Sequence, residues 1–426
     1  MKILKYGSRG PSVQLLQLGL NRAGYGPLAQ DGIFGAKTRD ALARFQIDAK
    51  ITPDGVAGSA TQRAMFPWYA GYTVHVIRPG DTLYAIARVY GASLAAVTAA
   101  NPDAAAGNLR PGSTVNVPLD FDVVPTDIAY TSDLVSYCVR GLAARYPLLE
   151  TGQLGISVMG TPLWYMRAGK GAARVFYNAS HHANEWITTP VLLKFCEDLC
   201  KACVSGRNIY GQSARELLAA ASIYIAPAVN PDGIDLVTGA LTDGAYYDYA
   251  RSLAARYPQY PFPSGWKANI RGIDLNLQYP AGWEQAKINK EAMGIASPAP
   301  GDYVGPSPLY AQESRAMYDF TLALDPVLTL SYHTQGAVIY WRYLDYEPKN
   351  AKSIAETFSA VSGYTVEDTP FASGFAGYKD WYIQQYDRPG YTIECGQGQN
   401  PLPISDFNKI YEDNLGILVL GAAAVI

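Results

Sequence analysis

Hydrophobic and polar positions along the chain follow three different patterns, which predict three structural segments. In residues 1–68 the apolar side chains recur every three or four positions, as the helices of a small bundle require. Residues 71–119 begin and end with alternating apolar and polar positions and carry a helical pattern between them. In residues 125–426, apolar runs of strand length alternate with longer helical stretches. We therefore expect a small all-α domain, a βααβ domain and a large α/β domain.

The large segment predicts a mixed β-sheet with helices on both faces. Its clearest strands are the apolar runs Val175–Tyr177, Ile223–Ala226, Val327–Ser331 and Tyr391–Glu394. The stretch Thr189–Cys203 is the clearest helix between strands. Alternation of strands and helices is typical of a sheet covered on both sides. The apolar stretch 415–426 is too short to span a bilayer and predicts a terminal helix packed on the domain.

The first segment contains an internal repeat. Asp31–Thr38 (DGIFGAKT) recurs as Asp54–Thr61 (DGVAGSAT), and each copy is a glycine-punctuated turn followed by the start of a helix. With its helical pattern, the segment resembles the peptidoglycan-binding domain of three helices that many cell-wall hydrolases carry. A generic helical bundle with another partner is the alternative.

The second segment has its turns at informative places. Pro79–Asp81 forms a turn before a helix that begins at Thr82, and Asn101–Pro102 breaks the helical pattern before the last strand. The segment resembles a LysM module, a unit that recognises chains of N-acetylglucosamine. His75 lies on its first strand, and we expect it to be a surface residue rather than a metal ligand.

Composition and charge narrow the functional classes. Of the 426 residues, 49% are hydrophobic and 17% are charged, which is typical of folded domains. The net charge of -3 argues against a broad surface for nucleic acid or an anionic membrane, so neither partner is expected. Residues 1–10 contain no apolar run after a basic start, and no signal peptide is predicted.

Histidine is scarce, and its placement indicates a metal site. Three of the four histidines fall in the large segment, at positions 181, 182 and 333. His182 and Glu185 are three residues apart where a loop enters a helix, so both side chains can reach one metal ion. Catalytic zinc sites usually combine two histidines with one glutamate and leave a position for water. His333, just after a predicted strand, is the best third ligand, and we expect one Zn²⁺ per chain, with Co²⁺ or Mn²⁺ as substitutes.

Three further motifs occur one after another along the large segment. Asn230–Gly233 (NPDG) comes after a strand, Asp274–Asn276 (DLN) follows a glycine, and Glu394 ends the last strand. Together with the histidine motifs they resemble the zinc carboxypeptidase family, of the carboxypeptidase A type, over residues 125–426. The resemblance implies that His182, Glu185 and His333 bind zinc, that Glu394 is the catalytic general base, and that Asp274 holds the far side of His182.

The resemblance also implies a cation that stabilises the negatively charged oxygen of the intermediate. The family uses an arginine there, and Lys267 matches its place best, with Arg271 as the alternative. A solvated loop lysine is the other interpretation of Lys267. Asn276 is expected to contact substrate.

The chain departs from the family pattern at two positions. Exopeptidases of the family carry Asp-x-Asn-Arg, whose arginine clamps the free carboxylate of the substrate, but here Leu277 follows Asn276. The family's mobile substrate-capping tyrosine has no counterpart, and the nearest aromatic residue, Phe371, is the candidate for substrate contact there. Both departures argue against trimming of C-terminal residues.

One branch of the family shares these departures. Asp274–Leu277 and Gly377–Trp381 resemble the γ-D-glutamyl-L-diamino acid endopeptidases, which cleave between the γ-carboxyl of D-Glu and meso-diaminopimelate or lysine in wall peptides. Lys379 lies in the second motif, and our hypothesis is that it pairs with a carboxylate of diaminopimelate. An ordinary helix-surface lysine is the alternative.

The sequence thus predicts a zinc-dependent peptidoglycan hydrolase whose partners are glycan strands and stem peptides. The alternatives are a zinc carboxypeptidase that releases C-terminal residues and a non-catalytic wall-binding protein. We expect a location at the bacterial cell wall or the spore. Without a predicted signal peptide, release by lysis or during sporulation would bring a cytoplasmic enzyme to the wall.

Overall fold

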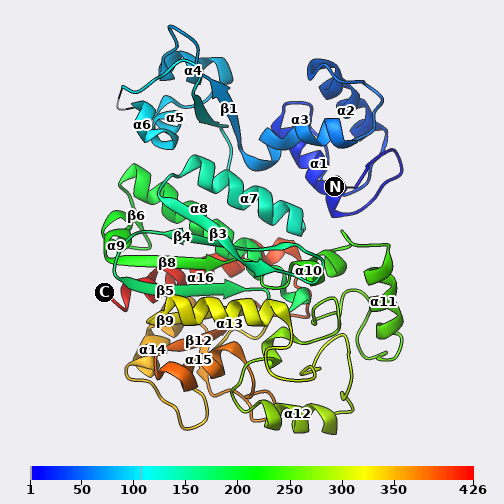
Figure 1. The fold of residues 1–426 in the computed structure, drawn as a ribbon, viewed down its shortest axis with the longest axis vertical. Coiled ribbons are helices and arrows are strands. Elements are labelled where there is room, and N and C mark those ends of the chain that lie inside the picture. The colour runs from blue at the N-terminus through cyan, green and yellow to red at the C-terminus, as the bar shows by residue number, and fades with distance from the viewer. Residues whose placement is uncertain (1, 106) are drawn as a thin grey trace. The chain divides into compact units, whose positions relative to one another are not determined.

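The computed structural model describes residues 2–105 and 107–426, and their contacts form two compact units, residues 1–150 and 151–426 (Figure 1). Met1, the first residue of the expected 1–68 domain, lies outside the described residues. Helix α7 (Ser132–Arg145) belongs to the first unit, although the sequence pattern places it in the 125–426 segment. The division into three domains stays a prediction.

The repeat in the first unit forms two equivalent turns. The helices around it are α1 (Pro11–Arg22), α2 (Ala36–Asp48) and α3 (Ser59–Ala70). Gln17 on α1 donates a hydrogen bond to the Asp31 carboxylate at 2.8 Å, and Gln46 on α2 donates to that of Asp54 at 3.0 Å. Each glutamine also accepts the N–H of the glycine after its aspartate. Both glutamines are buried, so one side chain stabilises each turn from inside the bundle.

The expected βααβ order is present, with one additional short helix. Its elements are β1 (Tyr72–Val76), α4 (Leu83–Tyr90), α5 (Leu94–Ala100), α6 (Pro102–Ala105) and β2 (Thr114–Pro118), and the two strands are antiparallel. Asn101 donates to the Val97 carbonyl at 2.7 Å and to the Asn116 carbonyl at 2.6 Å, which ties the helix break to β2. His75 is half-buried, and its Nε2 lies 2.9 Å from a carboxylate oxygen of Asp81.

The second unit is built on an eight-stranded mixed sheet. The strand order is β11 (Thr365–Glu367), β10 (Val338–Tyr340), β12 (Gly390–Glu394), β9 (Leu328–His333), β5 (Ala173–Ala179), β8 (Ala221–Ala226), β4 (Pro162–Ala168) and β3 (Leu149–Ile156). The central strands β12, β9, β5 and β8 are parallel to their neighbours among themselves, whereas β10 and β4 are antiparallel to β12 and β8. The four strands expected from the apolar runs are the four central ones.

Helices cover both faces of this sheet, as two consecutive residues of β5 demonstrate. Phe176 packs against aromatic rings of α13 (Gln312–Leu324) and α15 (Tyr378–Tyr386). The next residue, Tyr177, packs against Phe195 of α8 (Thr188–Ser205) and donates to the Leu418 carbonyl of α16 (Phe407–Ala423). Because successive side chains of a strand point to opposite faces, the two helix layers lie on opposite sides of the sheet. The expected fold class and terminal helix are confirmed.

The remaining elements connect these layers. They are η1 (Ala183–Glu185), β6 (Asn208–Ile209), β7 (Gln212–Ser213), α9 (Ala214–Ala220), α10 (Pro231–Thr238), α11 (Ala245–Ala254), η2 (Leu275–Leu277), α12 (Trp283–Ala292), α14 (Ala351–Ser362) and η3 (Ile404–Asp406). Among the described residues, no single helix is long and apolar enough to cross a membrane. Only α4 and α5 taken together have the length and composition of a membrane-spanning segment, and these two helices are bent by 117° relative to each other.

Candidate functional site

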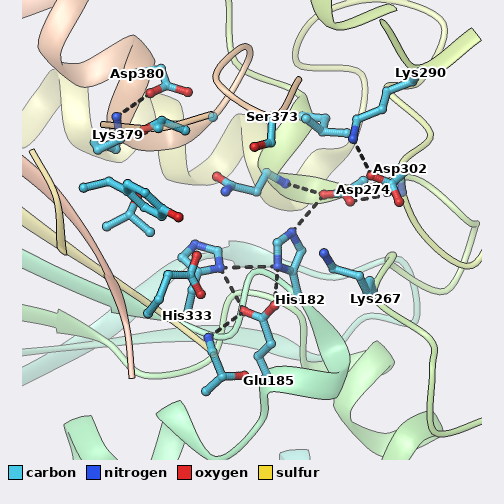
Figure 2. A pocket seen from close by; sticks show the side chains of 18 residues that line it. His182, Glu185, Lys267, Asp274, Lys290, Asp302, His333, Ser373, Lys379 and Asp380 are labelled. Atoms are coloured by element: carbon cyan, nitrogen blue, oxygen red, sulfur yellow. Dashed lines mark hydrogen bonds and ion pairs between the residues drawn. The ribbon is translucent and has the colours of Figure 1, made fainter. Parts of the chain in front are cut away.

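Two histidines and a glutamate converge at the carboxyl ends of neighbouring strands. His182 follows β5, Glu185 ends η1, and His333 is the last residue of β9, which pairs in parallel with β5. All three residues are buried, and their ligand atoms lie within 4.8 Å of one another. Figure 2 shows the two imidazoles and the carboxylate turned toward one another. The structure therefore brings together the three residues that the sequence predicts as metal ligands.

The donor set of this group fits one zinc ion. His182 Nδ1 lies 2.8 Å from Glu185 Oε1, His333 Nδ1 lies 2.9 Å from Glu185 Oε2, and the two Nδ1 atoms are 3.3 Å apart. Two imidazole nitrogens and one carboxylate, converging in a buried place, are the protein ligands of many catalytic zinc sites. Among the described residues, no other trio of histidine, cysteine or acidic side chains converges in this way.

Asp274 fixes the second ring nitrogen of His182. Its Oδ1 lies 3.2 Å from His182 Nε2, and its Oδ2 accepts the backbone N–H of Asp302 at 3.1 Å. Burial acts to lower the pKa of His182, but the carboxylates of Glu185 and Asp274 outweigh it and raise that pKa to about 9. When the Nε2 proton is held by Asp274, the Nδ1 lone pair is free to face a cation.

Asn230, in the NPDG motif, holds the loop that carries His182. Its side-chain N–H group donates to the His181 carbonyl at 3.2 Å and to the Ala268 carbonyl at 2.9 Å. Nearby, the Ala183 N–H donates to the Lys267 carbonyl at 3.0 Å. The motif thus joins the metal-binding loop to the segment that carries Lys267.

Glu394 lies beside His182, Glu185 and His333, which we call the metal group. It is the last residue of β12, its Cα partner across the parallel pairing is His333, and it lines the same cavity as the three ligands. Burial, with the nearby Glu185 carboxylate, raises the pKa of Glu394 to about 8. A cation bound by the metal group would lower that pKa again, because it stabilises the charged form.

The structure separates the two candidate cations. Lys267 is half-buried and lines the cavity of about 210 Å³ that contains the metal group. Burial acts to lower the pKa of Lys267, but surrounding carboxylates, Glu185 first, raise it. Arg271 is exposed and lines a different hollow. Asn269 accepts the N–H groups of both Arg271 and Ile273, and this turn directs the arginine away from the metal group.

The expected substrate-binding residues are only partly brought together. Asn276 and Lys379 line the cavity. Lys379 is buried, its Nζ lies 2.6 Å from Asp380 Oδ1, and it donates to the Arg342 carbonyl at 2.6 Å. Phe371 is 68% exposed and lines a neighbouring hollow, so it does not reach the metal group.

The sequence patterns missed one charged pair of the cavity. Lys290 Nζ lies 2.6 Å from Asp302 Oδ1, and both residues line the cavity behind Asp274. Tyr260 donates its hydroxyl to Asp302 Oδ2 at 2.6 Å. These residues lie on a helix and on loops without a recognisable motif, so their place beside Asp274 is set by the tertiary fold alone.

Three family models match the chain. A model described as zinc carboxypeptidase matches residues 136–416, a peptidoglycan binding domain matches residues 9–65, and a LysM domain matches residues 75–118. The first match includes the predicted metal ligands, Asp274 and Glu394.

Two bacterial relatives each match 68% of the chain. Gamma-D-glutamyl-L-diamino acid endopeptidase 1 of Lysinibacillus sphaericus is 41% identical over 293 residues, which are 68% of this chain and 72% of that protein. The uncharacterized protein YqgT of Bacillus subtilis (strain 168) is 38% identical over 292 residues, which are 68% of this chain and 76% of that protein.

Solved structures share the fold at low sequence identity. Bovine thrombin-activatable fibrinolysis inhibitor, bound to a tick carboxypeptidase inhibitor, superposes with a TM-score of 0.55 at 20% identity and covers 70% of this chain and 98% of its own. Carboxypeptidase A from Helicoverpa armigera gives a TM-score of 0.54 at 18% identity and covers 84% of this chain and 98% of its own. These likenesses support the architecture of the sheet and its helices.

Proposed function

The chain belongs to the zinc carboxypeptidase family, and from this premise we propose that it hydrolyses the bond between the γ-carboxyl of D-Glu and the diamino acid of peptidoglycan stem peptides. The name of the Lysinibacillus relative, at 41% identity, supports this bond as the target. The matches to a peptidoglycan binding domain and a LysM domain support a cell-wall polymer as the substrate. Such modules concentrate an enzyme on its polymer.

The observation that carries the choice of an endopeptidase is the position of Leu277. This leucine lines the cavity, and it follows Asn276 at the motif position where the family's exopeptidases have their carboxylate-clamping arginine. An alkyl side chain cannot form the bidentate ion pair that selects a free C-terminus. Among the described residues, the cavity lining contains the lysines 267, 290 and 379 and no arginine. A substrate whose chain continues beyond the cut is therefore acceptable to this site.

His182, Glu185 and His333 would hold the zinc ion, which when bound supplies Lewis-acid activation of water and polarisation of the scissile carbonyl. Glu394, at the edge of the same cavity, accepts a proton from the attacking water and later donates it to the leaving amine. Its place beside His333 keeps the carboxylate near the reacting atoms without a rearrangement of the backbone.

Three other residues support the reaction from fixed positions. The Lys267 ammonium offers positive charge where the carbonyl oxygen becomes negative, and neighbouring carboxylates keep it protonated. Asp274 holds the Nε2 proton of His182 and so keeps that ring in the orientation that ligation needs. Asn276 accepts the Tyr378 N–H at 3.0 Å, which fixes the loop facing the substrate.

A digest of L-Ala-γ-D-Glu-meso-diaminopimelate-D-Ala, followed by mass spectrometry, tests the proposal. We expect L-Ala-D-Glu as the released product from the wild type, and none after chelation of zinc or with Glu394→Gln. The same peptide with an amidated C-terminus should be cleaved at a similar rate, because the site has no carboxylate clamp. Release of D-Ala would identify a carboxypeptidase, and no release at all would contradict the proposed substrate.

We further propose that the spore wall is one place of action, on the resemblance to the endopeptidase branch with its sporulation-linked members. Release of soluble muropeptides from purified spore walls and from vegetative walls, compared at equal enzyme concentration, tests this. Equal release from both walls would remove the preference for the spore.

A further inference from the structure

A second hollow lies on the surface of the catalytic unit, next to the cavity of the metal group. It has a volume of about 400 Å³ and is lined mainly by apolar and aromatic side chains. The lining residues are Ala245, Tyr246, Tyr249, Arg271, Ile273, Pro298, Tyr303, Pro306 and Tyr310. Tyr249 is 44% exposed and Tyr310 is 51% exposed, so ring surface is open to solvent. We call this feature the tyrosine hollow.

The tyrosine hollow shares a wall with the catalytic cavity. Ile273 and Tyr303 line the hollow, while Asp274 and Asp302, their immediate neighbours in sequence, line the cavity. The Asp274 N–H donates to the Tyr303 carbonyl at 2.9 Å, and this hydrogen bond joins the two loop segments of the wall. A ligand in the hollow is therefore separated from the metal group by only two backbone segments.

The shared wall lies on one side of the metal group, and the proposed diamino acid site lies on the other. Figure 2 shows Lys379 and Asp380 at one end of the cavity and Lys267 and Asp302 at the other. If the diamino acid after the cut faces Lys379, the part of the substrate before the cut runs toward Asp302. Tyr303, which follows Asp302 in the sequence, lines the tyrosine hollow.

The part of the substrate before the cut ends in a sugar. In peptidoglycan the peptide L-Ala-γ-D-Glu is attached through a lactyl ether to a ring of the glycan strand, so the sugar lies two residues from the cut. An extended chain advances about 3.3 Å per α-linked residue, and the γ-link of D-Glu and the lactyl group lengthen the path, so the sugar lies roughly 10 Å or more from the reacting atoms. The tyrosine hollow begins directly beyond the cavity wall formed by Asp274 and Asp302, because their sequence neighbours Ile273 and Tyr303 line it.

We propose that the tyrosine hollow binds the sugar ring to which the stem peptide is attached, an inference that rests on the proposed function. The apolar face of a pyranose packs on aromatic rings, and tyrosine adds a hydroxyl that can bond to sugar hydroxyl and acetamido groups. Four tyrosines line the hollow, and the exposed Arg271 adds a further donor at its edge. Few polar groups on a mainly apolar wall are typical of small-ligand sites.

The test compares two substrates that differ only in the sugar. One is the free peptide L-Ala-γ-D-Glu-meso-diaminopimelate, and the other is the same peptide on its disaccharide of N-acetylglucosamine and N-acetylmuramic acid. We expect the full-length wild type to cleave the disaccharide-linked peptide with about tenfold higher kcat/KM, mainly through a lower KM. Equal kcat/KM values for the two substrates would overturn the proposal.

Variants locate the effect in the tyrosine hollow. The double variant Tyr249→Ala/Tyr310→Ala should remove the preference for the sugar and leave cleavage of the free peptide unchanged. The matched variant Tyr249→Phe/Tyr310→Phe keeps the ring faces and should keep most of the preference. A preference that survives the alanine variant, or an equal loss on both substrates, would place sugar recognition elsewhere.

The free peptide separates this proposal from the proposed function. If the wild type fails to cleave the free peptide and its disaccharide-linked form alike, the proposed function fails. If it cleaves both at the same rate, the function stands and the sugar site falls. Circular dichroism of each variant, compared with the wild type, confirms that the fold is intact before the rates are compared.

Discussion

Glu394 and His333 are partners in register on the neighbouring parallel strands β12 and β9. The pairing continues beyond them, because the Cys395 N–H donates to the His333 carbonyl at 2.9 Å. The proposed general base and a proposed metal ligand therefore lie on one hydrogen-bonded ladder at the carboxyl ends of buried strands. A ladder fixes their separation more firmly than two loops would, and fixed charges cost no reorganisation during the reaction.

The first prediction concerns the general base. Glu394→Gln should lower kcat on the stem peptide by about a factor of 10² to 10⁴, because the amide cannot take a proton from water. KM and zinc content should change little, since Glu394 is not a ligand. The exposed Glu412 on α16 offers a matched control, and Glu412→Gln should keep full activity. Loss of bound zinc in Glu394→Gln would assign the residue a different role.

The second prediction concerns the metal. His333→Ala should lose the bound ion and all measurable hydrolysis, because one of three protein ligands is missing. His75→Ala, on β1 of the other unit, should keep both. Zinc per chain, measured by atomic absorption, distinguishes the two variants, and chelation followed by added Zn²⁺ should abolish and restore wild-type activity. Full zinc content in His333→Ala would contradict the assigned ligand set.

The central strands and the meeting of His182 with His333 were predictable because each of these histidines follows an apolar run. Val175–Tyr177 and Val327–Ser331 are unmistakable buried strands, and a histidine comes soon after each. Parallel strands present their carboxyl ends at one edge, so these histidines could be expected to meet. The pairing of Glu394 with His333 was not predictable, because strand order and register depend on contacts between distant segments.

The loops around the cavity could not be predicted from local patterns. Arg271 and Lys267 are four residues apart, yet the turn held by Asn269 sends only the lysine toward the metal group. Likewise Asp302 donates its backbone N–H to Asp274, a contact that any residue type except proline could make. Sequence patterns report side-chain chemistry and periodicity, whereas these placements come from backbone hydrogen bonds between loops.

The third prediction separates the two candidate cations. Lys267→Met should lower kcat on the free peptide by about a factor of 10² to 10³, the usual effect of removing one donor to a developing negative oxygen. Lys267→Arg should recover part of that loss because the charge is kept. Arg271→Ala should cost much less, because its side chain lies outside the cavity. A larger loss for Arg271→Ala than for Lys267→Met would reverse the assignment.

The fourth prediction concerns the pH dependence of stability. Glu313 on α13 is buried, and burial raises its pKa above the ordinary 4.5, although it accepts hydrogen bonds from the Val158 N–H and from Asn269. Since the folded-state pKa is raised, the stability that the neutral form contributes is complete below 4.5 and is lost as the pH rises through the folded pKa.

The melting temperature of the wild type minus that of Glu313→Gln should therefore be largest in acid and should decrease as the pH rises. The glutamine variant cannot ionise, so its own curve lacks this component. Thermal melts in a series of buffers measure this difference. Glu412 is exposed, so the corresponding difference between the wild type and Glu412→Gln should not change with pH. A difference that grows with pH would show that the carboxylate is stabilised by the fold.

The fifth prediction concerns the diamino acid. Lys379 lines the cavity and is paired with Asp380, so its ammonium is already held where a substrate carboxylate could join it. Lys379→Ala should lower kcat/KM on the diaminopimelate peptide by about tenfold or more, the effect of losing a hydrogen bond between charged groups. The matching lysine peptide lacks that carboxylate, and its kcat/KM should change little. Because both substrates are measured on the same variant, a general disturbance caused by leaving Asp380 without its partner affects both rates and cancels in their ratio. An unchanged ratio would make Lys379 a structural partner of Asp380 and leave recognition of diaminopimelate to other residues of the cavity.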